Sequence, residues 1–141
     1  MRTTPIWLSS PEEVVVTEVD ALGQLEGVRA ARDGSTLRVT LCSPGNRNAQ
    51  TPATWRRLAA LRGLVDDGVR AVVLDAEGPS FCAGLDRRML SAEGVPGQES
   101  LLSLATRDQA QQDAFVRQAQ SALTWWREVP AVTVALVSGH A

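Results

Sequence analysis

Cysteine and histidine are scarce in this sequence of 141 residues, which contains two cysteines and one histidine. Cys42 and Cys82 are too few for a disulfide framework and do not have the spacing of a zinc motif. Such low usage favours free, partly buried thiols in a reducing cytoplasm. A catalytic pair of Cys82 and His140 is disfavoured, because the two residues are distant in sequence and a third member is missing.

Long hydrophobic runs and long basic runs are also missing. The first eight residues have no apolar core of signal-peptide length, and the apolar run near 131–137 is far too short to cross a bilayer. The net charge is −2 and the arginines are dispersed, so electrostatics support neither a nucleic acid nor an anionic membrane as a partner. A hydrophobic fraction of 44% and a charged fraction of 21% indicate one soluble globular domain.

Strands and helices alternate along the chain. Asp33 and Gly34 supply the positive φ angles of a two-residue hairpin turn. Thr51 suits a helix N-cap, Pro52 suits the first helical position, and Gly68 is a good stop signal. The expected elements are a hairpin of 28–32 and 36–41, a helix from Pro52 towards Gly68, a buried strand at 69–74, a helix from about 108 to 128 and a buried strand at 132–137.

The second helix has a clear apolar stripe. Its members recur at spacings of four and three, which predicts one face packed on the sheet, and Pro130 ends the helix. Strand, helix and strand with short connections predict right-handed βαβ units. The stripe consists of Phe115, Ala119, Ala122, Trp126 and Val129.

The segment Phe81–Arg88 carries most of the chemical information. Ala83 and Gly84 are small, so the backbone there can approach a ligand closely. The residues after them begin a short helix, whose free N–H groups can face an acceptor. Such groups can stabilise an oxyanion, and Arg87 or Arg88 can bind a phosphate.

Each of these features also has an explanation without a ligand. The segment fits a tight strand-to-helix turn, and its arginines would then be solvated surface charges. Asp86 is better suited to be a helix cap than a base. His140 is best explained as a loop residue, and the tryptophans as core residues.

Phe81–Arg88 resembles the binding loop of the crotonase family, which is the enoyl-CoA hydratase/isomerase family. Three further segments agree in the family's order: Pro44–Ala49 with its Pro-x-x-x-Asn-Ala turn, Val69–Asp75 with the strand before the loop, and Pro130–Ala141 with its strand and Gly-x-Ala ending. The resemblance implies an α/β domain with an incomplete ClpP/crotonase fold over 27–141, in which a β-hairpin is followed by βαβ units. Residues 1–26, with a strand-like run at 13–19, would be an N-terminal extension.

The resemblance implies an acyl-CoA substrate and an enolate stabilised by an oxyanion hole. The backbone N–H of Leu85 is then the first oxyanion donor, and Arg88 lies near the CoA phosphates. Gln50 stands where the family usually has an apolar residue. No metal or redox cofactor is implied, CoA being part of the substrate, and the full-length family fold implies a homo-oligomer. The residues expected to contact the substrate are Asn48, Ala49, Ala83, Gly84, Leu85, Asp86, Arg87 and Arg88.

The family's second oxyanion loop and its catalytic glutamates lie beyond the matched segments, so we expect a domain truncated before that loop. The implied function is that of an enoyl-CoA hydratase, a lyase of fatty acid metabolism, with isomerase members sharing the same motifs. The alternatives are a non-catalytic remnant or CoA-binding module, and an unrelated α/β domain. Without a cover, the strand at 132–137 should expose apolar side chains and favour self-association.

Overall fold

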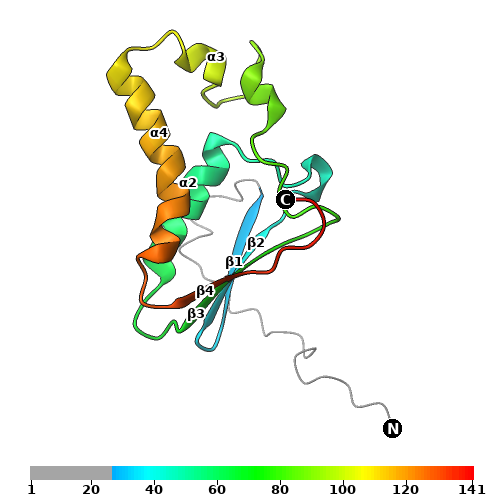
Figure 1. Ribbon diagram of the computed structural model, residues 1–141, viewed down its shortest axis with the longest axis vertical. Coiled ribbons are helices and arrows are strands. Elements are labelled where there is room, and N and C mark those ends of the chain that lie inside the picture. Colours follow the sequence, from blue (N-terminus) through cyan, green and yellow to red (C-terminus); the bar gives the residue numbers. More distant parts are fainter. Residues whose placement is uncertain (1–26) are drawn as a thin grey trace.

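A four-stranded mixed sheet forms the centre of the computed structural model, which describes residues 27–141. The expected extension 1–26 and its strand-like run lie outside these residues. The strands follow chain order, with β1 and β2 antiparallel and β2, β3 and β4 parallel (Figure 1). Their bounds are β1 Val28–Asp33, β2 Thr36–Leu41, β3 Ala71–Ala76 and β4 Val132–Ala135.

The predicted hairpin is confirmed, but its turn lies one residue further along. Asp33 pairs with Thr36, so Gly34 and Ser35 form the turn. Gly34 has a φ of 55°, whereas neither Asp33 nor Ser35 has a positive φ. A glycine at the first turn position is therefore sufficient, and Asp33 remains the last residue of β1.

The first helix begins where the sequence predicted. In α2 (Pro52–Ala60) the Thr51 side chain accepts a hydrogen bond from the Thr54 N–H at 3.4 Å, and the Thr54 hydroxyl accepts one from the Thr51 N–H. The prediction that Gly68 ends this helix is wrong. The α-helix ends at Ala60 and is followed by the 3-10 helix η3 (Leu61–Leu64), after which the chain is no longer helical. The Asp66 carboxylate accepts a hydrogen bond from the Gly68 N–H at 2.8 Å, a local turn that replaces a further helical turn.

The second helix, α4 (Gln109–Thr124), is capped by Asp108 and continues into η5 (Trp125–Arg127). Trp125 is 2% exposed, whereas Trp126, which the stripe placed in the core, is only partly buried. A 3-10 helix has three residues per turn, so the change at Trp125 rotates the inward face by one position. The short helix α3 (Leu101–Leu104) precedes α4, and the stretch 91–98 is a loop as expected.

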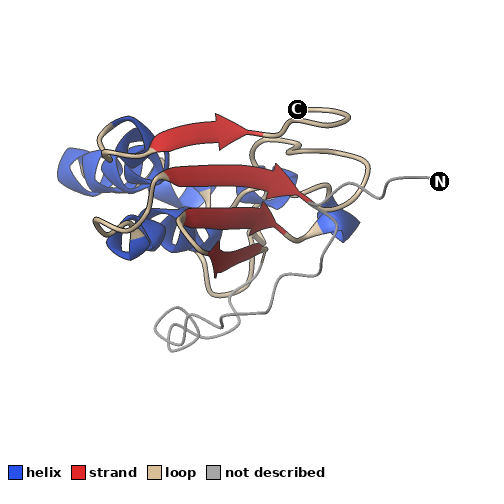
Figure 2. Cartoon of the chain, turned by 90° about the horizontal axis from the view of Figure 1, so that it is seen from below, coloured by secondary structure: helices blue, strands red, loops and turns tan. Residues whose placement is uncertain are grey.

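Helices α2 and α4 cover one face of the sheet (Figures 1 and 2). The core between the layers is formed by alternate residues of β2 and β3 and the inward faces of the helices. The expectation of a buried strand over 132–137 is wrong, because β4 ends at Ala135 and is exposed, with Val132 at 66% and Val134 at 42%. This exposure is the one expected of its apolar side chains where no further element covers them. Fully buried side chains of the core include Leu37, Val39, Val72, Leu61 and Trp125.

The segments that follow β2, β3 and β4 meet at one end of the sheet, because these parallel strands all have their C-terminal ends there. The Phe81 N–H donates to the His140 carbonyl oxygen at 2.7 Å, which joins the loop after β3 to the segment after β4. Gly139 makes this approach possible: its φ is 68°, and a Cβ there would lie 2.0 Å from the Pro79 oxygen. The segment Phe81–Arg88, which the sequence predicted to be a binding loop, lies at this end of the sheet.

Candidate functional site

The loop after β3 and the turn after β2 run side by side. The Ala83 N–H donates to the Arg47 oxygen at 2.9 Å, the Gln50 N–H to the Gly84 oxygen at 2.7 Å, and the Asp86 N–H to the Gln50 oxygen at 2.9 Å. These bonds form a short parallel bridge between Gln50 and Leu85. Two of the segments that the sequence predicted to form one site are thus directly joined.

Asn48 is buried next to this pairing and joins the turn after β2 to the loop after β3. It is 3% exposed and adopts a left-handed backbone with φ of 55°, which asparagine tolerates well. Its Oδ1 accepts from the Ser43 N–H at 2.8 Å, and its Nδ2 donates to the carbonyl oxygens of Glu77 and Ser80, each at 2.9 Å. The Asn48 side chain is therefore a buried support of these two segments and is not among the residues that line the pocket.

The peptide between Gly84 and Leu85 has a defined direction. Its carbonyl oxygen accepts the bond from Gln50, and a trans peptide points its N–H the opposite way, so the Leu85 N–H faces away from Gln50. Within residues 27–141 this N–H has no hydrogen-bond acceptor. Gly84 has a φ of 78°, and no atom lies within 4 Å of the position a Cβ would take. The space beside this peptide is open, and glycine is needed there for its backbone conformation.

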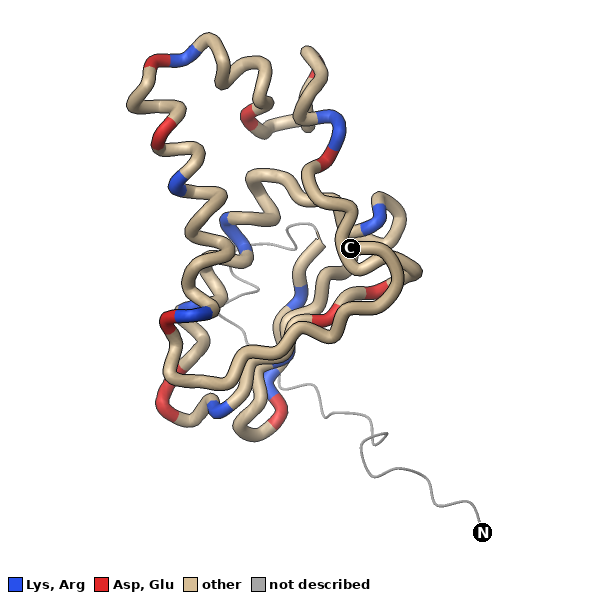
Figure 3. The backbone as a smooth tube through the Cα atoms, in the orientation of Figure 1, with Lys and Arg blue, Asp and Glu red and all other residues tan. Residues whose placement is uncertain are grey.

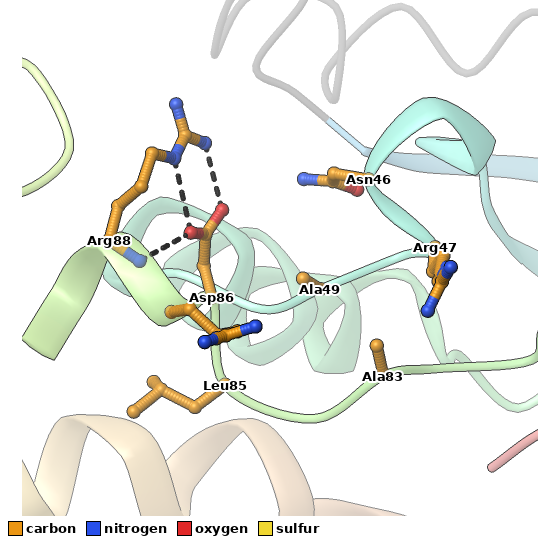
Figure 4. Close-up of a pocket in the computed structure, with 8 residues that line it drawn as sticks. Asn46, Arg47, Ala49, Ala83, Leu85, Asp86 and Arg88 are labelled. Atoms are coloured by element: carbon orange, nitrogen blue, oxygen red, sulfur yellow. Dashed lines mark hydrogen bonds and ion pairs between the residues drawn. The ribbon is translucent and has the colours of Figure 1, made fainter.

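A pocket of about 400 Å³ opens between the two segments (Figure 4). A second hollow of about 380 Å³ adjoins it and shares Asn46, Ala49 and Arg88. The pocket brings together most of the residues that the sequence predicted to contact substrate, but not Gly84 or Asn48. It is lined by Asn46, Arg47, Ala49, Ala83, Leu85, Asp86, Arg87 and Arg88.

Asp86 is buried at the edge of this pocket and paired with Arg88. Its carboxylate accepts from Nη2 of Arg88 at 2.8 Å, from Nε at 3.1 Å and from the backbone N–H at 3.0 Å, capping η4 (Arg87–Leu90). The Arg88 guanidinium lowers the pKa of Asp86. A carboxylate held ionised in this way is a poor proton acceptor, which agrees with its interpretation as a cap.

Two further arginines give the pocket a net positive lining. Arg47 and Arg87 are exposed and stand on opposite segments, so the lining has three guanidinium groups and one carboxylate. Elsewhere acidic and basic residues are interspersed along the chain (Figure 3). The resemblance placed the turn that contains Asn46 and Arg47 close to the pantetheine and adenine side of the substrate, without counting either residue as a contact, and in the structure both line the pocket. Guanidinium groups around an open pocket suit a phosphate ligand.

The thiol of Cys82 is not paired with His140. Its Sγ donates to the Asn48 carbonyl oxygen at 3.3 Å, and the His140 side chain is exposed. In the part of the chain that the structure describes, no three His, Cys, Asp or Glu side chains gather as metal ligands. No helix there has the length and apolarity to cross a membrane.

Comparison with solved structures finds chains that are similar to this one. The solved structure of a "putative enoyl-CoA hydratase" from Thermobifida fusca YX in complex with acetoacetyl-CoA is 34% identical, with a TM-score of 0.76 over 88% of this chain and 46% of that one. The same protein in complex with CoA is 33% identical, with a TM-score of 0.71 over 88% of this chain and 45% of that one. The fold class expected from the resemblance is thereby confirmed.

A curated relative agrees with these structures over a shorter segment. "Putative enoyl-CoA hydratase EchA13" of Mycobacterium tuberculosis is 46% identical over 56 residues, which are 38% of this chain and 18% of that protein. No family model matches the chain. The chain thus spans less than half the length of these similar proteins.

Proposed function

We propose, from the premise that this chain belongs to the enoyl-CoA hydratase (crotonase) family and corresponds to part of its fold, that the pocket binds the CoA part of an acyl-CoA thioester. The observation that carries the proposal is the Leu85 N–H, which has no acceptor among the described residues and belongs to a pocket lined by guanidinium groups. The similar structures with bound acetoacetyl-CoA and CoA support the same ligand class.

The reaction we propose for the whole protein is hydration of a 2-enoyl-CoA. The thioester oxygen would accept the Leu85 N–H, and its negative charge would grow as the enolate forms. A preorganised donor of this kind contributes about 3–4 kcal/mol to such a barrier. Arg47 and Arg87, on opposite segments of the pocket, would meet the phosphates of CoA.

A CoA-binding module without catalysis is the second candidate. One observation favours it: the only carboxylate among the residues that line the pocket belongs to Asp86, which is held by Arg88. The second oxyanion donor and the catalytic glutamates implied by the resemblance have no counterpart among residues 27–141. A cytoplasmic location and a homo-oligomer stay predictions.

Titration calorimetry of the 141-residue chain with CoA and with pantetheine tests the proposed ligand. We expect CoA to bind more tightly, with an affinity that falls as salt rises, and Arg87→Gln to weaken CoA but not pantetheine. Equal affinity for both ligands, or no binding of either, contradicts the proposal.

Hydration of crotonyl-CoA, followed by loss of the conjugated thioester absorbance, tests whether the 141-residue chain is catalytic by itself. If CoA binds without turnover, this chain by itself acts as the binding module, and the proposed hydration needs residues outside it. If turnover occurs, its own residues complete the catalytic site.

A further inference from the structure

Gln50 is a polar residue at a position where the resemblance implies an apolar one, and its amide is bonded at both ends. Its Oε1 accepts from the Trp55 indole N–H at 2.9 Å, and its Nε2 donates to Sγ of Cys82 at 3.5 Å. An indole nitrogen can only donate, so Trp55 determines which end of the amide is the oxygen. The amide nitrogen is therefore directed at the thiol.

The network continues from Cys82 to the proposed oxyanion donor. Sγ of Cys82 also accepts from the Gly84 N–H at 3.4 Å. The Gly84 carbonyl oxygen accepts from the Gln50 N–H at 2.7 Å. Gln50 thus holds Gly84 on both sides, through its own backbone and through the thiol. The next peptide group along the chain carries the Leu85 N–H.

We propose that Gln50 is a positioning residue for the Leu85 N–H. Its side chain, oriented by Trp55, holds Cys82 and so fixes the Gly84–Leu85 peptide with its N–H turned to the open side. A single hydrogen bond to sulfur is weak. At Gly84, however, the bond from its N–H to Sγ of Cys82 is added to the backbone bond that its carbonyl oxygen accepts from Gln50. The role of the Leu85 N–H in catalysis rests on the proposed function. The proposal that Gln50 fixes the Gly84–Leu85 peptide does not.

The test compares Gln50→Leu and Trp55→Phe with Gln120→Leu, a control of the same chemical change on the exposed side of α4. Hydrogen exchange of the Gly84 amide is measured by NMR in the ligand-free chain and corrected for global stability. We expect exchange to quicken by about threefold to tenfold in both Gln50→Leu and Trp55→Phe, the factor of one lost hydrogen bond, and to stay constant in Gln120→Leu. Unchanged exchange in Gln50→Leu overturns the proposal.

A second readout asks whether the positioning affects the thioester. The infrared band of [1-¹³C]butanoyl-CoA bound to the wild-type chain should shift to lower frequency, because a donor polarises the carbonyl. In Gln50→Leu at least half of that shift should be lost, while the Kd of CoA changes less than about twofold, since the arginines are untouched. A full shift in Gln50→Leu contradicts a role in the oxyanion site. If the wild-type chain binds no acyl-CoA, the proposed function fails, and amide exchange still decides whether Gln50 holds the loop.

Discussion

Replacing Asn48 by alanine should cost more stability than any other single change around the pocket. The side chain is buried and bonds to Ser43, Glu77 and Ser80, which lie before the turn and in the segment after β3. Alanine leaves the Ser43 N–H and two carbonyl oxygens without this partner. It also places a Cβ without a polar group in the left-handed region, since φ is 55°.

The magnitude follows from these contacts. Three hydrogen bonds at about 1 kcal/mol each give about 3 kcal/mol, and the left-handed backbone adds about 1 kcal/mol for alanine. The expected loss in the free energy of unfolding is therefore about 4 kcal/mol. With a urea m-value of about 2 kcal/mol per molar, the unfolding midpoint should fall by about 2 M.

Urea unfolding followed by tryptophan fluorescence measures this loss, and Asn46→Ala is the matched control. Asn46 is exposed two residues away, so its replacement should change stability by less than about 0.5 kcal/mol. Asn48→Gly relieves the backbone cost and should recover about 1 kcal/mol of the loss, which keeps the comparison measurable if the alanine variant unfolds. Equal midpoints for Asn48→Ala and Asn46→Ala would refute the reasoning.

Three further predictions concern Gly139, Thr51 and Asp86. Gly139→Ala should lower the free energy of unfolding, measured in urea, by about 3 kcal/mol, because the new Cβ meets the Pro79 backbone oxygen. Gly84→Ala should lower it by only about 1–2 kcal/mol, because only the positive φ disfavours alanine there. Equal losses for the two variants would contradict this description of the packing. Thr51→Ala removes the capping box of α2 and should lower the free energy of unfolding by about 1 kcal/mol, a loss that Thr51→Ser largely restores. Arg88 lowers the pKa of Asp86, so the stabilisation from this pair is complete above the ordinary carboxyl pKa of about 3.9 and is lost as pH falls through the depressed value. A stability–pH curve should therefore flatten below about pH 4 in Asp86→Asn, and an unchanged acid limb would rule out the pair as its cause.

The elements that local signals define could be predicted from the sequence. Gly34 marked the hairpin, and Thr51 with Pro52 marked the start of α2, because turn and cap preferences depend on a few neighbouring residues. The end of α2 and the inward face near Trp125 could not be read in this way. Both depend on a change from α to 3-10 geometry that no single residue announces.

The site was predictable as a list of segments but not as an arrangement. The resemblance named the residues on both sides of the pocket, and the structure joins those segments through the Gln50–Leu85 bridge. It did not reveal that Asn48 is a buried link between them, because its three partners come from positions that only the folded sheet brings together. It also gave no reason for the amide of Gln50, whose bonds to Trp55 and Cys82 depend on the same folding.

The most direct test of the central claim is an NMR titration of the ¹⁵N-labelled chain with an acyl-CoA. The account predicts saturable shifts that concentrate at the backbone amides of Leu85, Arg87 and Arg47, with the largest change at the Leu85 N–H as it gains an acceptor. The absence of shifts, or shifts confined to the exposed residues of β4, would contradict it.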